Sequence, residues 1–160
     1  MTGALVWDAS VVLASYLSAT LGPAARQRDG EPVVRLPAGA KCIELGCGLG
    51  LAGLAAAALG MDVTLTDRDE VLPLIAASVA ANDVGRPVAV ASLSWGDDDA
   101  AQALRPGSSS FDCVLMADVI CAQRTIRNAS LAIAHRAVVA KQLPARSFAW
   151  SRHAKLRALA

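Results

Sequence analysis

A ten-residue, glycine-rich stretch, ELGCGLGLAG, occupies positions 44–53 and has the residue types of a ligand-binding loop. An apolar run precedes it and an alanine- and leucine-rich run follows it, so we expect a strand before the loop and a helix after it. Glycines at such a turn allow a tight bend and let bare backbone approach a ligand where a Cβ atom would collide. The stretch therefore predicts a small-molecule site between a strand and a helix.

Two classes of ligand fit the loop. Gly48, Gly50 and Gly53 match G-x-G-x-x-G, the pattern in which a helix N-terminus faces the pyrophosphate of a dinucleotide. Read from Glu44, the same stretch is E-x-G-x-G-x-G, beginning its glycines at Gly46, and this is the pattern of a loop that cradles S-adenosylmethionine. Both loops join a strand to a helix, so the loop alone leaves the two ligands open.

The acidic residues near the loop favour S-adenosylmethionine, which carries a sulfonium cation, an amino-acid end and a ribose diol but no phosphate. Glu44 at the end of one strand and Asp67 at the end of the next suit such a ligand, whereas Glu44 is less expected beside a pyrophosphate. A structural alternative is that Glu44 caps the loop and that Gly53 packs the helix. Asp67 follows Gly48 by 19 residues and also suits a ribose of NAD, so an NAD-dependent oxidoreductase stays the less favoured hypothesis.

Predicted helices alternate with predicted strands along the chain. We expect helices at 7–23, 51–59 and 69–82, strands at 41–45, 62–67, 87–95 and 111–117, and a surface loop at 96–110. This alternation predicts an α/β fold with a doubly wound, mostly parallel, Rossmann-like sheet and helices on both faces. Asp8 is the expected N-cap of the first helix. No apolar run reaches the roughly 18 residues of a membrane span, and the N-terminus lacks the basic region of a signal peptide.

The net charge of +1 conceals a division of the 160-residue chain. Residues 1–118 contain all 14 acidic residues and seven basic ones, a net −7, whereas residues 119–160 contain eight basic residues and no acid, a net +8. We therefore predict a cofactor-binding domain at 1–118 and a basic tail at 119–160, helical or disordered. The tail is either a genuine segment that binds nucleic acid or an acidic partner, or the product of an altered reading frame, a retained intron or an alternative exon.

The four cysteines form no C-x-x-C pair and have no histidine close by in the sequence, which suits neither a zinc site nor a disulfide framework. We expect no metal, reduced thiols, and a location in the cytoplasm or, alternatively, the nucleus. Cys47 is interpreted as a small residue of the loop rather than a reactive thiol.

Four motifs occur in one order: VWDASVVLASYL, ELGCGLGLAGLAAAALGMDVTLTD, SLSWGD and FDCVLMADVI. Together they resemble the class I, seven-strand methyltransferases. More narrowly they resemble the methyltransferase-like group that modifies lysines of chaperones, ATPases and translation factors. The resemblance covers residues 3–120 and implies S-adenosyl-L-methionine as cofactor and a protein with a target lysine as partner, with no membrane association.

The resemblance also implies roles for individual residues. Trp7 lies against the methionyl side of the cofactor, Asp67 accepts hydrogen bonds from both ribose hydroxyls, and Trp95 flanks the adenine. The loop backbone is supplied by Gly46, Cys47 and Gly48, and Ala117 closes the site. Tryptophan faces attract both π-systems and cations, which suits an adenine or a sulfonium. The structural alternatives are that Trp7 packs at the helix entry and that Trp95 is a core aromatic.

Asp118 is the candidate catalytic residue on the substrate side, because it follows the fourth predicted strand at the edge where such sheets bind ligands. In the family this acid begins D-[VI]-[VI]-Y; here Cys121 stands in place of the tyrosine. An N-cap for a following helix is the alternative role of Asp118. The resemblance ends there, so we expect the family's last strands to be lacking. The alternative to an active methyltransferase is a catalytically incomplete fragment that binds cofactor or serves in an interaction.

Overall fold

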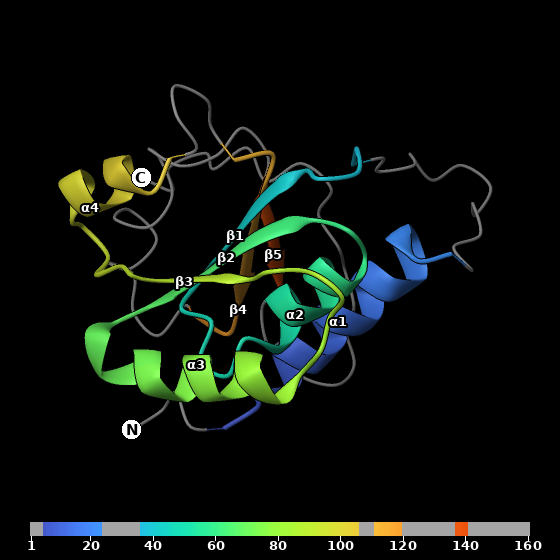
Figure 1. Ribbon diagram of the computed structural model, residues 1–160, viewed down its shortest axis with the longest axis horizontal. Coiled ribbons are helices and arrows are strands. Elements are labelled where there is room, and N and C mark those ends of the chain that lie inside the picture. The colour runs from blue at the N-terminus through green and yellow to red at the C-terminus, as the bar shows by residue number, and fades with distance from the viewer. Residues whose placement is uncertain (1–4, 24–35, 106–110, 120–136, 141–160) are drawn as a thin grey trace, which may run out of the picture.

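The computed structural model describes residues 5–23, 36–105, 111–119 and 137–140, and Figure 1 shows their arrangement. Helices and strands alternate along the chain as the sequence predicts. Their order is α1 (Asp8–Leu21), β1 (Lys41–Leu45), α2 (Leu51–Ala58), β2 (Asp62–Asp67), the 3-10 turn η2 (Asp69–Val71), α3 (Leu72–Ala81), β3 (Ala89–Ser92), α4 (Asp98–Ala103), β4 (Cys113–Ala117) and β5 (Ala137–Ala140). None of the described helices is long and apolar enough to cross a membrane.

The described strands form one sheet in the order β3-β2-β1-β4-β5, and every neighbouring pair is parallel. From β1 the chain adds β2 and β3 on one side and then returns to place β4 and β5 on the other. The strand order therefore reverses beside β1, and the carboxyl ends of β1 and β4 border the crevice where open α/β sheets bind their ligands. The predicted fold class is confirmed, and the glycine loop lies at this switch point.

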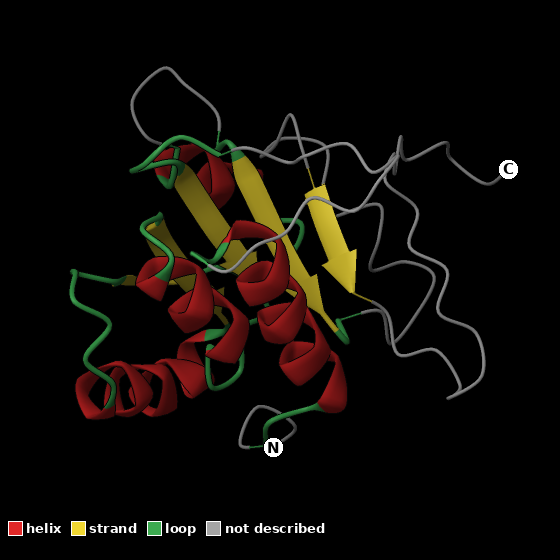
Figure 2. Cartoon of the chain, turned by 90° about the vertical axis from the view of Figure 1, so that its right-hand side faces the viewer, coloured by secondary structure: helices red, strands yellow, loops and turns green. Residues whose placement is uncertain are grey.

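The two faces of the sheet carry separate apolar clusters. Helices α1, α2 and α3 pack on one face, against side chains such as Cys42 and Leu65, and α4 covers part of the other, against Ile43 and Leu45 (Figures 1 and 2). Alternate residues of β1 enter opposite clusters because successive side chains of a strand point to opposite faces. This alternation sends the side chain of Glu44 to the face covered by α2.

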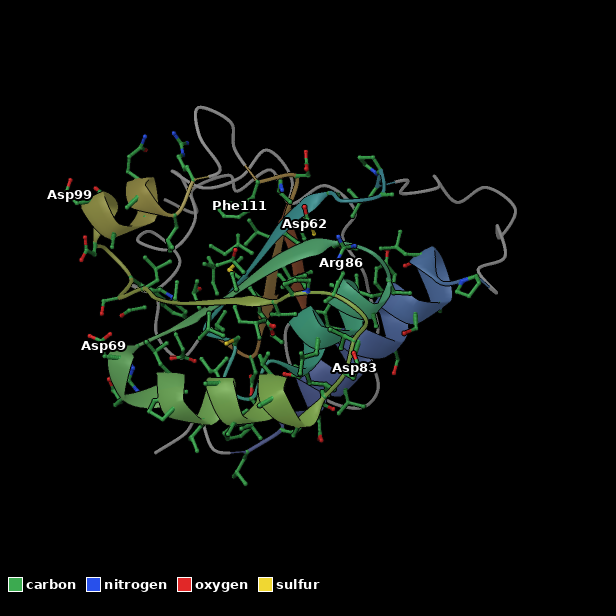
Figure 3. All side chains as sticks on the ribbon, in the orientation of Figure 1. Asp62, Asp69, Asp83, Arg86, Asp99 and Phe111 are labelled. Atoms are coloured by element: carbon green, nitrogen blue, oxygen red, sulfur yellow. The ribbon has the colours of Figure 1, made fainter. Side chains whose placement is uncertain are left out.

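Ion pairs join the start of β1 to the start of β2, at the end of the sheet opposite the glycine loop. Asp62 pairs with Arg86 and with Lys41, whose Nζ lies 2.7 Å from Oδ2 of Asp62. Figure 3 shows Asp62 and Arg86 together, far from the acidic residues Asp69 and Asp99. Lys41 and Arg86 therefore lie away from the glycine loop, whereas the carboxylate of Asp67 lies beside it.

Three predictions about individual elements need correction. The N-cap position of α1 is Trp7 and not Asp8, which is the first helical residue and acts through its charge near the helix N-terminus. The strand expected at 87–95 is confined to Ala89–Ser92, since Pro87 has no amide to donate to a ladder. The loop expected at 96–110 contains α4, because the side chain of Asp97 accepts a hydrogen bond of 2.9 Å from the amide of Ala100 and so caps a short helix.

The tail is described only at its start and at Ala137–Ala140. These four residues form β5 beside β4, so the expectation of helix or disorder is wrong there. Two adjacent β-branched valines favour a strand, and β4 offers an edge for pairing. Val119, the first residue of the predicted tail, is buried in the apolar cluster under α4. The other tail residues, Cys121 among them, lie outside the described residues, and the domain boundary stays a prediction.

Candidate cofactor site

The loop between β1 and α2 bends through three glycines in the left-handed region. Gly46, Gly48 and Gly50 have φ angles of 63°, 55° and 75°, a conformation that side-chain-bearing residues rarely adopt. The amide of Gly50 donates a hydrogen bond of 2.8 Å to the carbonyl of Cys47, and the amide of Cys47 donates one of 3.0 Å to the carbonyl of Thr66 on β2. The loop is thus a defined turn fixed to the neighbouring strand, as its glycine spacing predicts.

Asp67 at the end of β2 holds the middle of this loop. Its Oδ2 accepts a hydrogen bond of 2.9 Å from the amide of Gly48, and its Oδ1 accepts one of 2.8 Å from the amide of Arg68. An ionised carboxylate has about four acceptor positions, so two remain for a ligand. Asp67 is half-buried, and a diol could reach these positions.

Glu44 lies beneath the loop with only 1% of its surface exposed. Its Oε2 accepts a hydrogen bond of 2.7 Å from the amide of Gly53 in the first turn of α2. The residues paired with it on the adjoining strands are Leu65 and Leu115, both fully buried. Desolvation raises the pKa of Glu44 to about 8; the Gly53 hydrogen bond opposes this rise, and the charge of Asp67 adds to it.

This placement gives Glu44 the structural role that the sequence offers as its alternative. The same bond explains Gly53, because a Cβ atom there would collide with Leu65 and stand 2.6 Å from Oε2 of Glu44. Helix α2 and strand β1 therefore pack closely together around the carboxyl group of Glu44. The predicted contact of Glu44 with a cofactor stays a prediction.

Trp95, which belongs to the third sequence motif, lies beside the loop on the face of the sheet that α4 covers. A Cβ atom on Gly46 would stand 3.0 Å from Cζ2 of Trp95 and 2.9 Å from Cγ1 of Val119. The indole is half-buried and also packs against the apolar cluster under α4. Residues that follow β3 and β4 thus meet the loop at Gly46. Trp95 both packs in the core and lies beside the loop.

The end of β4 supplies Ala117 and Asp118. Ala117 is the last residue of the strand and is buried, with 8% of its surface exposed. Asp118 is half-buried and has a φ of 55°, and among the described residues it alone is a non-glycine with positive φ. Such a conformation costs about 1 kcal/mol, and strained residues of this kind gather at functional sites. The alternative role of Asp118 as an N-cap falls on residues that lie outside the described ones and stays a prediction.

Trp7 and Cys47 complete the predicted set. Trp7 begins α1 with 41% of its surface exposed, beside the exposed apolar side chains of Leu5, Val6 and Val11. The first turn of α1 lies on the side of the molecule where the strands have their carboxyl ends (Figures 1 and 2). Burial raises the pKa of the Cys47 thiol above its ordinary value, and the charges of Glu44 and Asp67 raise it further. This thiol is therefore protonated at neutral pH and is no nucleophile.

A family model described as "Lysine methyltransferase" matches residues 1–137 of the chain. The chain belongs to this lysine methyltransferase family.

Individual relatives agree with the family assignment. The mouse protein N-lysine methyltransferase METTL21A is 36% identical over 135 residues, covering 82% of this chain and 54% of the relative. Mouse EEF1A lysine methyltransferase 3 is 37% identical over 123 residues, covering 76% of this chain and 45% of the relative. The chain thus spans about half the length of the curated relatives it matches. A TehB-like SAM-dependent methyltransferase of known structure from Corynebacterium glutamicum matches with a TM-score of 0.42 and 22% identity over 65% of this chain and 55% of its own, too weakly to support an inference.

The geometry of this lysine methyltransferase chain fits S-adenosylmethionine better than a dinucleotide. A pyrophosphate needs free amides at a helix N-terminus, but the amide of Gly53 is already bonded to Glu44 and that of Gly50 to Cys47. The carboxylate of Asp67 beside the loop would also repel an anion and suit a cation. Gly46 leaves room next to Trp95 that a Cβ atom would fill. The oxidoreductase hypothesis therefore finds no support in the family to which the chain belongs.

Two hydroxyl groups that the sequence pattern did not indicate also fix the loop. Thr66 Oγ1 donates a hydrogen bond of 2.6 Å to the carbonyl of Glu44, and Ser78 Oγ on α3 donates one of 2.8 Å to the carbonyl of Leu49. The available signal was weak: a threonine just before Asp67, and a serine near the apolar side of a predicted helix. In the described part of the chain, no three His, Cys, Asp or Glu side chains are grouped as a metal ion requires.

Proposed function

We propose that the chain binds S-adenosylmethionine at the carboxyl ends of β1, β2 and β4 and transfers its methyl group to a lysine of another protein. The observation that carries the proposal is the loop at the switch point, where Asp67 holds the amide of Gly48 and still has acceptor positions to offer. S-adenosylmethionine supplies a methyl group that its positive sulfur already activates. The protein then has to hold the reactants in line and exclude water.

In this proposal, different residues around the loop bind different parts of the cofactor. Asp67 accepts hydrogen bonds from the ribose hydroxyls, and Trp95 lies beside the adenine next to Gly46. Trp7 lies against the methionyl side, near the sulfonium that an aromatic face attracts. These assignments rest on the position of each residue at one edge of the sheet and on the family to which the chain belongs.

Asp118 faces the substrate side in this proposal. Its strained backbone sits directly after β4, and its carboxylate attracts the lysine ammonium of a protein substrate. The ammonium must lose its proton to solvent before the amine can attack the methyl group; desolvation favours this loss, whereas the charge of the Asp118 carboxylate opposes it. Asp118 then orients the amine.

The protein substrate belongs, in this proposal, to the chaperones, ATPases and translation factors that the sequence resemblance suggests, and the location is the cytoplasm or the nucleus. One relative is named for the lysine methylation of EEF1A, which supports a translation factor as the first substrate to assay.

A second candidate function is a cofactor-binding or interaction module without catalysis. It rests on a group of exposed apolar side chains around the start of α1. The exposed apolar residues Leu5, Val6 and Val11 beside Trp7 are a surface on which such a module could be bound.

A thermal melt of the purified chain, alone and with S-adenosylhomocysteine or NAD, tests the cofactor. We expect S-adenosylhomocysteine to raise the melting temperature and NAD to leave it unchanged. Transfer of labelled methyl groups to lysines of cell-extract proteins then separates the two candidates. Incorporation supports the methyltransferase; cofactor binding without incorporation supports the module, and no shift with S-adenosylhomocysteine contradicts both.

A further inference from the structure

The buried carboxyl group of Glu44 accepts a hydrogen bond from the helix after the loop. The hydrogen bond from the Gly53 amide to Oε2 spans 2.7 Å and joins the end of β1 to the first turn of α2. Three left-handed glycines lie between these two residues in the sequence. Any change in the charge of Glu44 therefore acts on the anchor that holds both ends of the cofactor loop.

The surroundings of Glu44 disfavour its ionised form in the free chain. Leu65 and Leu115 flank it from the adjoining strands, and α2 carries no ionisable side chain. The ionisable groups that face it are Asp67 from β2, Cys47 from the loop and Cys42 from its own strand. None of these is a cation, and the charge of Asp67 opposes a second negative charge nearby.

The cofactor of the proposed function would change this balance, because it carries a sulfonium and an ammonium to the loop that Glu44 supports. A nearby positive charge favours an ionised carboxylate, and a carboxylate accepts a stronger hydrogen bond from the Gly53 amide than a neutral acid does. Cofactor binding therefore favours the ionisation of Glu44, and ionised Glu44 favours cofactor binding.

We propose that Glu44 is a positioning residue that loses its proton to solvent when S-adenosylmethionine binds, and that its carboxylate then fixes the loop and α2 through the Gly53 amide. The inference rests on the proposed function, since it needs a cationic ligand at the loop. It makes the affinity for the cofactor depend on pH through a carboxyl group buried beneath the loop. It also distinguishes the substrate from the product S-adenosylhomocysteine, which lacks the sulfonium charge.

Calorimetry of wild-type protein and of Glu44→Gln tests the linkage. Glutamine still accepts a bond from Gly53 but has no proton to lose. Because the pKa of Glu44 is raised to about 8 in the free chain, wild type at pH 7 should release up to about 0.9 proton more than Glu44→Gln on binding S-adenosylmethionine. Between pH 7 and 8.5 the affinity of wild type should rise up to about eightfold relative to the variant. S-adenosylhomocysteine should give a smaller release.

The comparison between the two proteins removes the titration of the ligand's own amino group, which falls in the same pH range and is common to both. Asp99→Asn, an exposed acid on α4, is the matched control and should behave as wild type. Equal proton release by wild type and Glu44→Gln overturns the inference while leaving the proposed function standing. No binding of either ligand by wild type overturns both.

A second measurement needs no variant. Carbon-13 NMR of the glutamate carboxyl groups follows the ionisation of Glu44 in wild type with and without S-adenosylmethionine. We expect the midpoint to fall by at least one pH unit on saturation, and an unchanged midpoint contradicts the linkage.

Discussion

The carboxylate of Asp67 and the amide of Gly48 are joined by a hydrogen bond of 2.9 Å, although 19 residues separate them in the sequence. The bond unites the end of β2 with the glycine loop after β1. A carboxylate in this position fixes the loop and leaves acceptor positions for the two hydroxyls of a ribose. The shape of the loop and the recognition of its ligand therefore depend on one side chain.

Replacing Asp67 with alanine should weaken the binding of S-adenosylhomocysteine by about 10- to 100-fold. Loss of one hydrogen bond to a charged group costs about 1.5–3 kcal/mol, and about 1.4 kcal/mol corresponds to a tenfold change in affinity, so this range is a lower bound for a carboxylate that binds both ribose hydroxyls. Isothermal titration calorimetry measures the change, with exposed Asp69→Ala as the control for removing an acid from the same edge. An affinity within twofold of wild type would show that Asp67 does not contact the ligand.

The packing of α2 on β1 leads to a prediction for Gly53. Its replacement with alanine should destabilise the chain by about 2–4 kcal/mol, because the new Cβ atom collides with Leu65 and with the Glu44 carboxyl group. Helix propensity alone would favour alanine by about 1 kcal/mol. Urea denaturation measures the outcome.

Gly85→Ala is the matched control for this substitution. No heavy atom lies within 4 Å of a Cβ atom at that position, although its φ of 74° makes alanine unfavourable there. We expect a cost of about 1 kcal/mol from the backbone alone. A smaller cost at Gly53 than at Gly85 would contradict the close packing around Glu44.

The ionisation of Glu44 predicts how the stability of the free chain depends on pH. Its pKa is raised from 4.5 to about 8 by folding, so between about pH 4.5 and 8 the folded chain holds a proton that the unfolded chain has lost. The free energy of unfolding should therefore include a contribution from Glu44 that is fully present below about pH 4.5 and is lost as the pH rises to 8. Urea denaturation from pH 5 to 9 should show this decline in wild type.

Glu44→Gln separates this contribution from those of other groups. The variant keeps an acceptor for the Gly53 amide and has no titrating proton, so its stability should decline less over the same range. Parallel pH profiles for the two proteins would place the titration elsewhere.

The fold and the glycine loop could be predicted from the sequence, whereas the support beneath the loop could not. Continuous apolar runs located β1 and β2 because both strands are buried, and the glycine spacing located the loop. The helix α4 was missed because six residues are too few to display a helical period, and its start depends on the capping of Ala100 by Asp97. The burial of Glu44 depends on how α2 docks, since a sequence pattern can assign the residue to a face but not identify the amide above it.

The last prediction concerns Asp118. Its backbone conformation favours glycine, whereas its proposed role requires a carboxylate. Replacement with glycine should stabilise the chain by about 1 kcal/mol, since glycine adopts a φ of 55° without strain. It should also reduce methyl transfer to lysine at least tenfold and leave the affinity for S-adenosylhomocysteine unchanged. Urea denaturation, calorimetry and labelled methyl incorporation measure the three quantities. A helix-capping role predicts instead that Asp118→Gly and Asp118→Ala both retain full methyl transfer, whatever their effect on stability.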